Sequence, residues 1–255
     1  KSCIHSLEML AKDPFGNYYF LKRILIFTMG CLTWFRYALV NKVQVSGMEK
    51  LSDLPKTGVL FVSNHQSYFA EVILLYHLFA AQKNGIINRL TLPWYLLNPR
   101  VRTYFIAAVE TMQSGFIPKL FAYAGSVSIK RTWREAGKNV NRKVDLKDIS
   151  NIGTALEGGW VITFPQGTTA PYVPGRRGTA HIIRKYDPVV VPIVIDGFRR
   201  AFDKKGLFLK KTGTTLSVKF KDPMHFSADI DAERMMDEIM LAIEQRPIPQ
   251  SVANF

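Results

Sequence analysis

The chain has 255 residues, of which 47% are hydrophobic, and it carries 34 lysine and arginine residues against 20 aspartate and glutamate residues. This composition excludes a disordered tail, and the length is ample for one sizeable domain with a buried core. The net charge of +14 implies an anionic partner: nucleic acid, an anionic membrane surface or a phosphorylated substrate. The basic residues are spread along the chain instead of forming one block, which argues against nucleic acid.

Residues 1–41 are expected to form a helical segment that lies in a membrane interface. The longest uncharged apolar run, Ile24 to Phe35, is flanked by basic residues and is shorter than the ~20 apolar residues that span a bilayer. A helix from Tyr18 to Val40, rich in aromatic residues and with cationic ends, suits the plane of the interface. A helix that packs on the protein core is the alternative. The two cysteines, Cys3 and Cys31, cannot form a disulfide framework, which favours a reducing compartment.

Residues 42–255 are expected to form one domain in which strands and helices alternate. Apolar runs bounded by turn residues predict strands at 43–45, 58–63, 103–109, 126–130, 160–164, 189–195 and 216–220, the last at a sheet edge. Helical spacing predicts helices at 68–82, 117–124, 148–156, 179–185 and 232–244. This alternation predicts an α/β fold with a largely parallel central sheet flanked by helices.

Polar residues stand at four of the expected strand ends, which is where α/β folds keep their chemistry. The four blocks are Asn64-His65-Gln66-Ser67, Gly125-Ser-Val-Ser-Ile-Lys-Arg131, Phe164-Pro-Gln-Gly-Thr168 and Val191-Pro-Ile-Val-Ile195. In their order and content they resemble the motifs of the glycerolipid acyltransferase superfamily, of the 1-acylglycerol-3-phosphate acyltransferase type. The resemblance extends over roughly Val43 to Ile243 and implies that acyltransferase fold.

His65 is the candidate catalytic base, because a neutral imidazole on a strand-to-helix turn can take the proton of an acyl acceptor. The family pattern has an aspartate five residues after the histidine, where this chain has Ala70. Glu71 follows directly, and a distorted first helical turn would let its longer side chain orient the imidazole. An exposed helix glutamate is the alternative for Glu71.

The same resemblance implies a substrate-binding set made of Asn64, Ser67, Arg131, Phe164, Pro165, Gln166, Gly167, Thr168 and Arg177. Two positions depart from the family: Gln166 replaces a glutamate, and Thr169 replaces an arginine that would face a phosphate. Guanidinium groups at 131, 176 and 177 could still hold an anionic head group. We therefore expect an acceptor other than plain lysophosphatidate. The backbone N–H groups of Gly167 and Thr168 are candidates for holding the thioester oxyanion.

These features predict an acyltransferase at the cytoplasmic face of the cell membrane, peripheral or monotopic. It would move a fatty acyl group from acyl carrier protein or acyl-CoA to the hydroxyl or amine of a lipid acceptor. The expected partners are the lipid acceptor, the acyl thioester and an anionic membrane surface, without nucleic acid. The sequence shows no metal-ligand spacing and no glycine-rich nucleotide loop, so no cofactor and no metal are expected. A catalytically inactive lipid-binding or interaction protein on the same fold is the alternative.

Overall fold

The apolar runs build a seven-stranded sheet in a computed structural model, which describes residues 11–113, 115–130, 134–135, 138–139, 145–227 and 229–246. From one edge to the other, the strands are β1 (Lys42–Ser46), β9 (Thr215–Phe220), β8 (Val189–Asp196), β2 (Val59–Ser63), β7 (Trp160–Thr163), β3 (Thr103–Ala108) and β4 (Ser126–Ile129). A separate antiparallel pair joins β5 (Arg134–Glu135) to β6 (Lys138–Asn139).

The expected fold class is confirmed, with one strand placed differently from the prediction. The five strands from β8 to β4 are parallel, whereas β9 runs antiparallel to β8 and pairs in parallel with β1. The prediction that residues 216–220 form an edge strand is wrong, because β1 covers that side of β9 and is itself the edge. The alternation of buried and outward residues along β9 is the same for an edge strand and for a strand with two neighbours.

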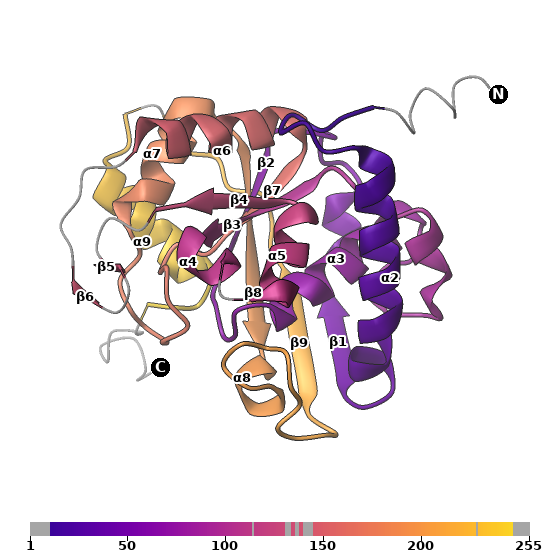
Figure 1. The fold of residues 1–255 in the computed structure, drawn as a ribbon. Coiled ribbons are helices and arrows are strands. Elements are labelled where there is room, and N and C mark those ends of the chain that lie inside the picture. The colour runs from indigo at the N-terminus through magenta and orange to yellow at the C-terminus, as the bar shows by residue number, and fades with distance from the viewer. Residues whose placement is uncertain are drawn as a thin grey trace, which may run out of the picture.

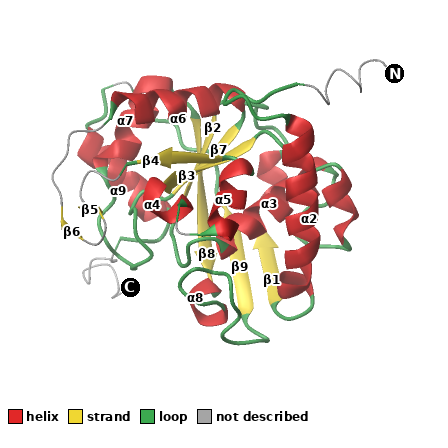
Figure 2. Cartoon of the chain, in the orientation of Figure 1, coloured by secondary structure: helices red, strands yellow, loops and turns green. Residues whose placement is uncertain are grey.

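Helices cover both faces of the sheet (Figures 1 and 2). They are α2 (Tyr19–Ala38), α3 (Ala70–Lys83), α4 (Val109–Met112), α5 (Phe116–Tyr123), α6 (Leu146–Gly158), α7 (Arg177–Tyr186), α8 (Phe198–Ala201) and α9 (Ala232–Ala242), with 3₁₀ turns η1 (Met48–Leu51) and η2 (Pro93–Leu97). One hydrophobic cluster joins the sheet to α2, α3 and α5, and a second joins the opposite face to α6, α7 and α9. The four-residue helices α4 and α8 were not expected, because one helical turn shows no hydrophobic period.

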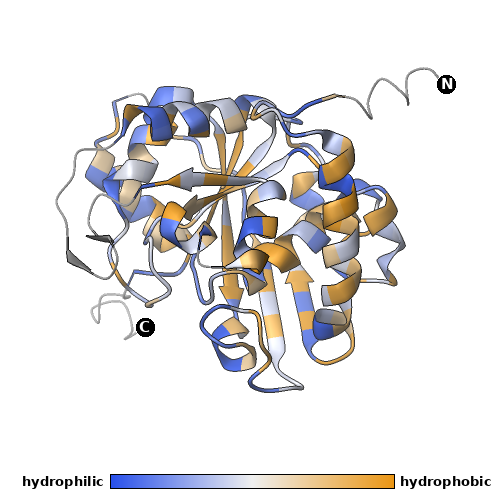
Figure 3. Ribbon diagram, in the orientation of Figure 1, coloured by the Kyte–Doolittle hydropathy of each residue, from blue (hydrophilic) through white to orange (hydrophobic). Residues whose placement is uncertain are grey.

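Helix α2 buries two of its charged side chains and exposes mainly apolar ones. Lys22 and Arg36 are only 2% and 8% exposed. The exposed residues of this helix are uncharged, namely Phe20, Leu21, Ile24, Thr28, Cys31, Leu32 and Phe35. Figure 3 shows hydrophobic residues along most of its length. No helix among the described residues is long and apolar enough to cross a membrane.

Both buried charges of α2 have polar and aromatic partners. The Lys22 ammonium donates to the carbonyl of Thr103 at 3.0 Å and lies 4.0 Å from the centre of the Tyr104 ring. Arg36 donates to the carbonyl of Gly206 at 3.1 Å. The alternative of a helix packed on the core therefore describes the inward face of α2. The domain boundary at residue 41 and the membrane role of the outward face stay predictions.

Candidate active site

The turn between β2 and α3 brings His65 and Glu71 together. His65 Nδ1 lies 2.7 Å from Glu71 Oε1, and the Glu71 side chain is fully buried. Helix α3 begins only at Ala70, after bends at residues 66–69. The bent connection absorbs the extra residue that separates this chain from the family spacing, so the carboxylate in the first helical turn points back at the imidazole.

The carboxylate of Glu71 also closes the turn by accepting hydrogen bonds from its backbone. Glu71 Oε1 accepts from the N–H groups of Gln66 at 2.8 Å and Ser67 at 2.9 Å, and the Ser67 hydroxyl donates to Oε2. Burial acts to raise the pKa of the Glu71 carboxyl, but the charge and hydrogen bond of His65 and the hydrogen bonds of Ser67 outweigh it and hold the pKa below its ordinary value. Glu71 is therefore an ionised acceptor, and Nδ1 of His65 carries the proton between them.

A segment distant in sequence supports the same turn from outside. The N–H groups of Tyr68 and Phe69 donate to the carbonyls of Lys204 and Lys205, each at 3.0 Å. Gly206 then passes so close that a Cβ atom would lie 2.5 Å from the backbone nitrogen of Ala70, and its φ of +76° favours glycine. These contacts support the bends that place Glu71.

His65 presents its second nitrogen to a cavity. Its ring stacks on Phe164, with 4.0 Å between ring centres, and its side chain is 14% exposed. With Nδ1 bonded to Glu71, Nε2 is the nitrogen left to accept a proton from a molecule in the cavity. Phe164, the residue directly after β7, thus fixes the imidazole plane from the strand beside β2.

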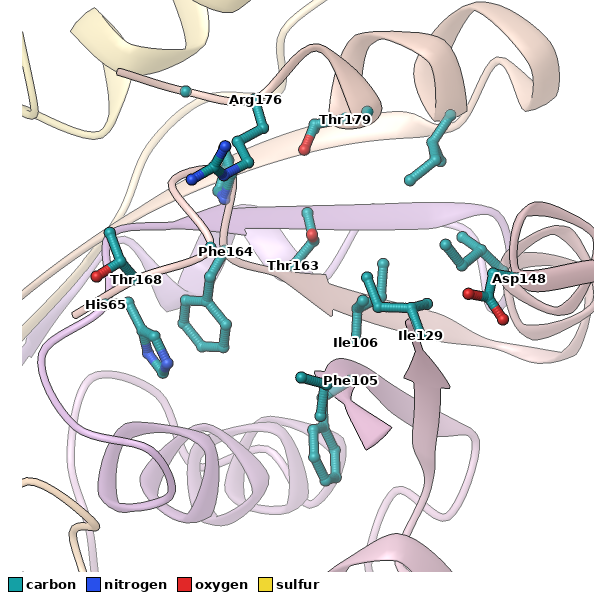
Figure 4. A pocket seen from close by; sticks show the side chains of 18 of the residues that line it. His65, Phe105, Ile106, Ile129, Asp148, Thr163, Phe164, Thr168, Arg176 and Thr179 are labelled. Atoms are coloured by element: carbon teal, nitrogen blue, oxygen red, sulfur yellow. The ribbon is translucent and has the colours of Figure 1, made fainter. Parts of the chain in front are cut away.

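The cavity has a volume of about 740 Å³ and runs along the carboxyl ends of β3, β4 and β7. Figure 4 shows His65 and Phe164 at one end and Asp148 at the other, with Ile106 and Ile129 between them. Further aliphatic lining comes from Ile149, Ile152 and Ile182. The cavity is therefore largely apolar along its length, with polar groups at both ends.

Asn64, Ser67 and Gln166, which were expected to bind substrate, are buried and absent from the cavity lining. Asn64 makes two hydrogen bonds to the backbone of Ile195, at 2.8 and 2.9 Å, and so fastens the end of β2 to the end of β8. Gln166 donates through Nε2 to Val173 O at 3.0 Å and to Gln245 Oε1 at 3.2 Å. All three residues therefore make hydrogen bonds within the protein that hold the backbone around the site.

The turn after β7 lines the cavity mouth with Phe164, Pro165, Gly167 and Thr168. The N–H of Gly167 donates to Phe164 O at 2.9 Å, with φ at +62°. The N–H of Gly167 therefore closes the turn, and the expectation that the N–H groups of Gly167 and Thr168 hold an oxyanion stays a prediction.

The basic candidates differ in where their side chains lie. Arg177 forms an exposed ion pair with Glu233 at 3.2 Å, although it also contributes to the cavity lining. Arg131 lies outside the described residues. Arg176, which the sequence suggested only as one of three guanidinium groups that could hold an anionic head group, lines the cavity and reaches towards Phe164 and Thr168 at the His65 end (Figure 4). The sequence pattern gives no way to tell the role of Arg176 from that of Arg177. Their side chains take different directions because α7 begins at Arg177.

Comparison with known proteins identifies the family. Residues 42–196 match the Acyltransferase family model, and the chain belongs to this family and is an acyltransferase. The fold is similar to that of the 1-acyl-sn-glycerophosphate acyltransferase PlsC from Thermotoga maritima, with a TM-score of 0.50 and 19% identity over 87% of this chain and 78% of that one. No curated protein sequence matches the chain. For an enzyme of this family, an acyl thioester donor and a lipid acceptor are expected.

Proposed function

We propose that the chain transfers a fatty acyl group from a thioester, acyl-CoA or acyl carrier protein, to a hydroxyl or amine of a lipid at a membrane surface. The observation that carries this proposal is the His65–Glu71 pair at the mouth of a long apolar cavity. An imidazole beyond reach of any carboxylate would have favoured an inactive protein on this fold. The Nδ1 to Oε1 distance of 2.7 Å supports catalysis instead.

In the proposed reaction, Nε2 of His65 accepts the proton of the acceptor hydroxyl as its oxygen attacks the thioester carbonyl carbon. A C–O bond forms, the C–S bond breaks, and the imidazolium returns the proton to the departing thiolate. Glu71 stabilises the imidazolium without taking its proton. No acyl-enzyme intermediate is required, because the acceptor attacks directly.

The shape and lining of the cavity support separate places for the acyl chain and for the anionic group of the substrates. The acyl chain would lie along the aliphatic wall that includes Ile106, Ile129 and Ile152. Arg176 would hold an anionic group of the acceptor or of coenzyme A near His65, in place of the family arginine that Thr169 replaces. The ion pair with Glu233 draws Arg177 towards the surface.

The proposed membrane contact is the outward face of α2, whose exposed residues are uncharged. Trp94 of η2 and Phe116 of α5 are 73% and 75% exposed, and both elements pack against α2. A membrane interface would accept this apolar surface without the free-energy cost of exposing it to water.

The purified chain would be incubated with labelled acyl-CoA or labelled acyl carrier protein and a total bacterial lipid extract, beside His65→Ala as control. Labelled lipid formed by the parent alone supports the proposal, and its head group identifies the acceptor. If neither donor labels any lipid while the protein still binds vesicles, the chain is a lipid-binding protein.

A further inference from the structure

A strongly basic segment follows β8, at the same end of the sheet as His65. We call residues 197–213 the α8–β9 segment, because it contains α8 and ends just before β9. Its six basic residues are Arg199, Arg200, Lys204, Lys205, Lys210 and Lys211. Its one acidic residue, Asp203, accepts from the N–H groups of Leu207 and Phe208 at 2.8 and 2.9 Å. The segment therefore presents an excess of positive charge that its own carboxylate does not neutralise.

The two arginines and the lysines have different surroundings. Arg199 donates to Thr169 O at 2.6 Å, and Arg200 pairs with Asp196 at 2.8 Å. The four lysines of the α8–β9 segment are exposed, and within the described part of the chain none of them forms an ion pair. Phe208 stands between the two lysine pairs with 70% of its surface exposed. Lys210 donates to Arg199 O at 3.4 Å. An exposed aromatic ring flanked by ammonium groups that no carboxylate neutralises is typical of a surface that meets lipid head groups.

The α8–β9 segment adjoins both the catalytic turn and the end of α2. Lys204 and Lys205 offer their carbonyls to the turn that carries His65. At the other end, Gly213 N donates to Val40 O at 2.8 Å, next to Leu39, which is 70% exposed. Figure 1 shows α8 at the same end of the molecule as the carboxyl end of α2. The lysines thus belong to a segment that adjoins the carboxyl end of α2.

We propose that the α8–β9 segment docks on the anionic head groups of a bilayer, with Phe208 entering the interface and the four lysines contacting lipid phosphates. This inference rests on the proposed function and adds a second contact to the one through α2. A bilayer fits both surfaces at once, since one is apolar and the adjoining one is cationic. An acidic carrier protein would match the lysines but leave the outward face of the 20-residue helix α2 exposed to water. Docking at this point would hold the His65 turn against the membrane.

The test measures vesicle flotation without acyl donor, so that its outcome does not depend on transfer. The full chain is compared with a variant carrying Lys204→Ala, Lys205→Ala, Lys210→Ala and Lys211→Ala. A matched control loses four exposed basic residues elsewhere, through Lys56→Ala, Lys147→Ala, Arg184→Ala and Lys185→Ala. Vesicles contain phosphatidylcholine alone or with one third phosphatidylglycerol.

The first variant should bind the phosphatidylglycerol vesicles at least about tenfold more weakly than the parent, whereas the control should change by less than about twofold. Binding to phosphatidylcholine alone should be equal in all three. In Phe208→Trp, phosphatidylglycerol vesicles should shift the added tryptophan emission to shorter wavelength. Unchanged vesicle binding by the lysine variant overturns the inference. So does a loss of transfer from acyl carrier protein with vesicle binding intact, since it would make the segment a carrier-protein site.

Discussion

The side chain of Glu71 does two tasks with one carboxylate, because it orients His65 and accepts the N–H groups of the turn. The position of Glu71 beside His65 could be predicted from the sequence because it depends on a few residues that are close together in the chain. The position of Asn64 could not be predicted, since its partner Ile195 comes from another strand. Local spacing can therefore suggest a catalytic pair, but it cannot separate residues that face the cavity from those that brace it.

Glu71→Gln should preserve the turn, because the amide oxygen still accepts from the N–H groups of Gln66 and Ser67. It removes the charge that stabilises the imidazolium, so kcat/KM for transfer should fall by about 10²–10⁴-fold. The lowered pKa of Glu71 also predicts a pH effect. At a pH between the lowered pKa and the ordinary pKa of about 4.3, the unfolded chain binds more protons than the folded chain. This stabilisation is therefore complete above about pH 4.3 and is lost as the pH falls through the lowered pKa.

Urea unfolding of parent and Glu71→Gln across pH 3–7 checks that second effect. The difference in their free energies of unfolding should be constant near neutral pH and shrink in acid. A rate within threefold of the parent, or a gap that widens in acid, would show that the carboxylate does not have this role.

Arg176 and Arg177 provide a matched pair of neighbours with different predicted roles. Arg176→Ala should raise the KM for the anionic substrate by about tenfold, since one charge-assisted hydrogen bond contributes about 1.5–3 kcal/mol. Arg177→Ala should change KM by less than about twofold, because an exposed ion pair with Glu233 contributes little. Steady-state kinetics of both variants decide the assignment, and equal effects would contradict it.

Gln166→Glu restores the family residue but should destabilise this chain. Gln166 is 1% exposed, and its amide donates to Val173 O and Gln245 Oε1, where a carboxylate could not donate. We expect a loss of about 2–4 kcal/mol in the free energy of unfolding from the buried charge and the lost donors. Gln44→Glu on the exposed side of β1 is the control and should stay within about 0.5 kcal/mol. A stable Gln166→Glu protein would refute this view of the turn.

Among the elements, the strands formed by apolar runs were predictable from the sequence, but the strands beside which they lie in the sheet were not. Residues 189–195 and 160–164 are runs made almost entirely of apolar residues, and they supply β8 and β7 in the interior of the sheet. The pairing of β1 with β9 joins residues more than 160 positions apart, so no local pattern reveals which strand is the edge. Helix α2 is the opposite case, because its apolar run was plain while the inward direction of Lys22 was not.

Lys22→Met tests the seating of α2. Burial lowers the pKa of Lys22 to about 7, with the charge of Asp13 partly opposing it. The folded chain therefore binds fewer protons than the unfolded chain between pH 7 and about 10.4, so stability should rise with pH by up to about 1.4 kcal/mol per unit.

In Lys22→Met this rise should disappear, while the carbonyl of Thr103 keeps its hydrogen bond from Tyr76 at 2.9 Å. Thermal unfolding of both proteins between pH 7 and 9 measures it. Parallel stability curves for the two proteins would mean that Lys22 does not titrate in this range.

The molecule as a whole gathers its chemistry at one end of the sheet. His65 and Phe164 follow β2 and β7, Ile195 lies near the end of β8, and the parallel register of these strands brings their carboxyl ends together. The net charge of +14 then suits an enzyme whose proposed partners, lipid head groups and acyl thioesters, are anionic. Composition pointed to that class of partner, and only the structure places the exposed lysines of the α8–β9 segment beside the catalytic turn.

The central claim is that Nε2 of His65 removes the acceptor proton, and chemical rescue tests it most directly. Transfer from the labelled thioester would be measured for the parent and for His65→Ala, with and without added imidazole. We predict that His65→Ala transfers at least about 10³-fold more slowly and that imidazole restores part of the rate by occupying the vacated site. Transfer by His65→Ala within tenfold of the parent would contradict the claim.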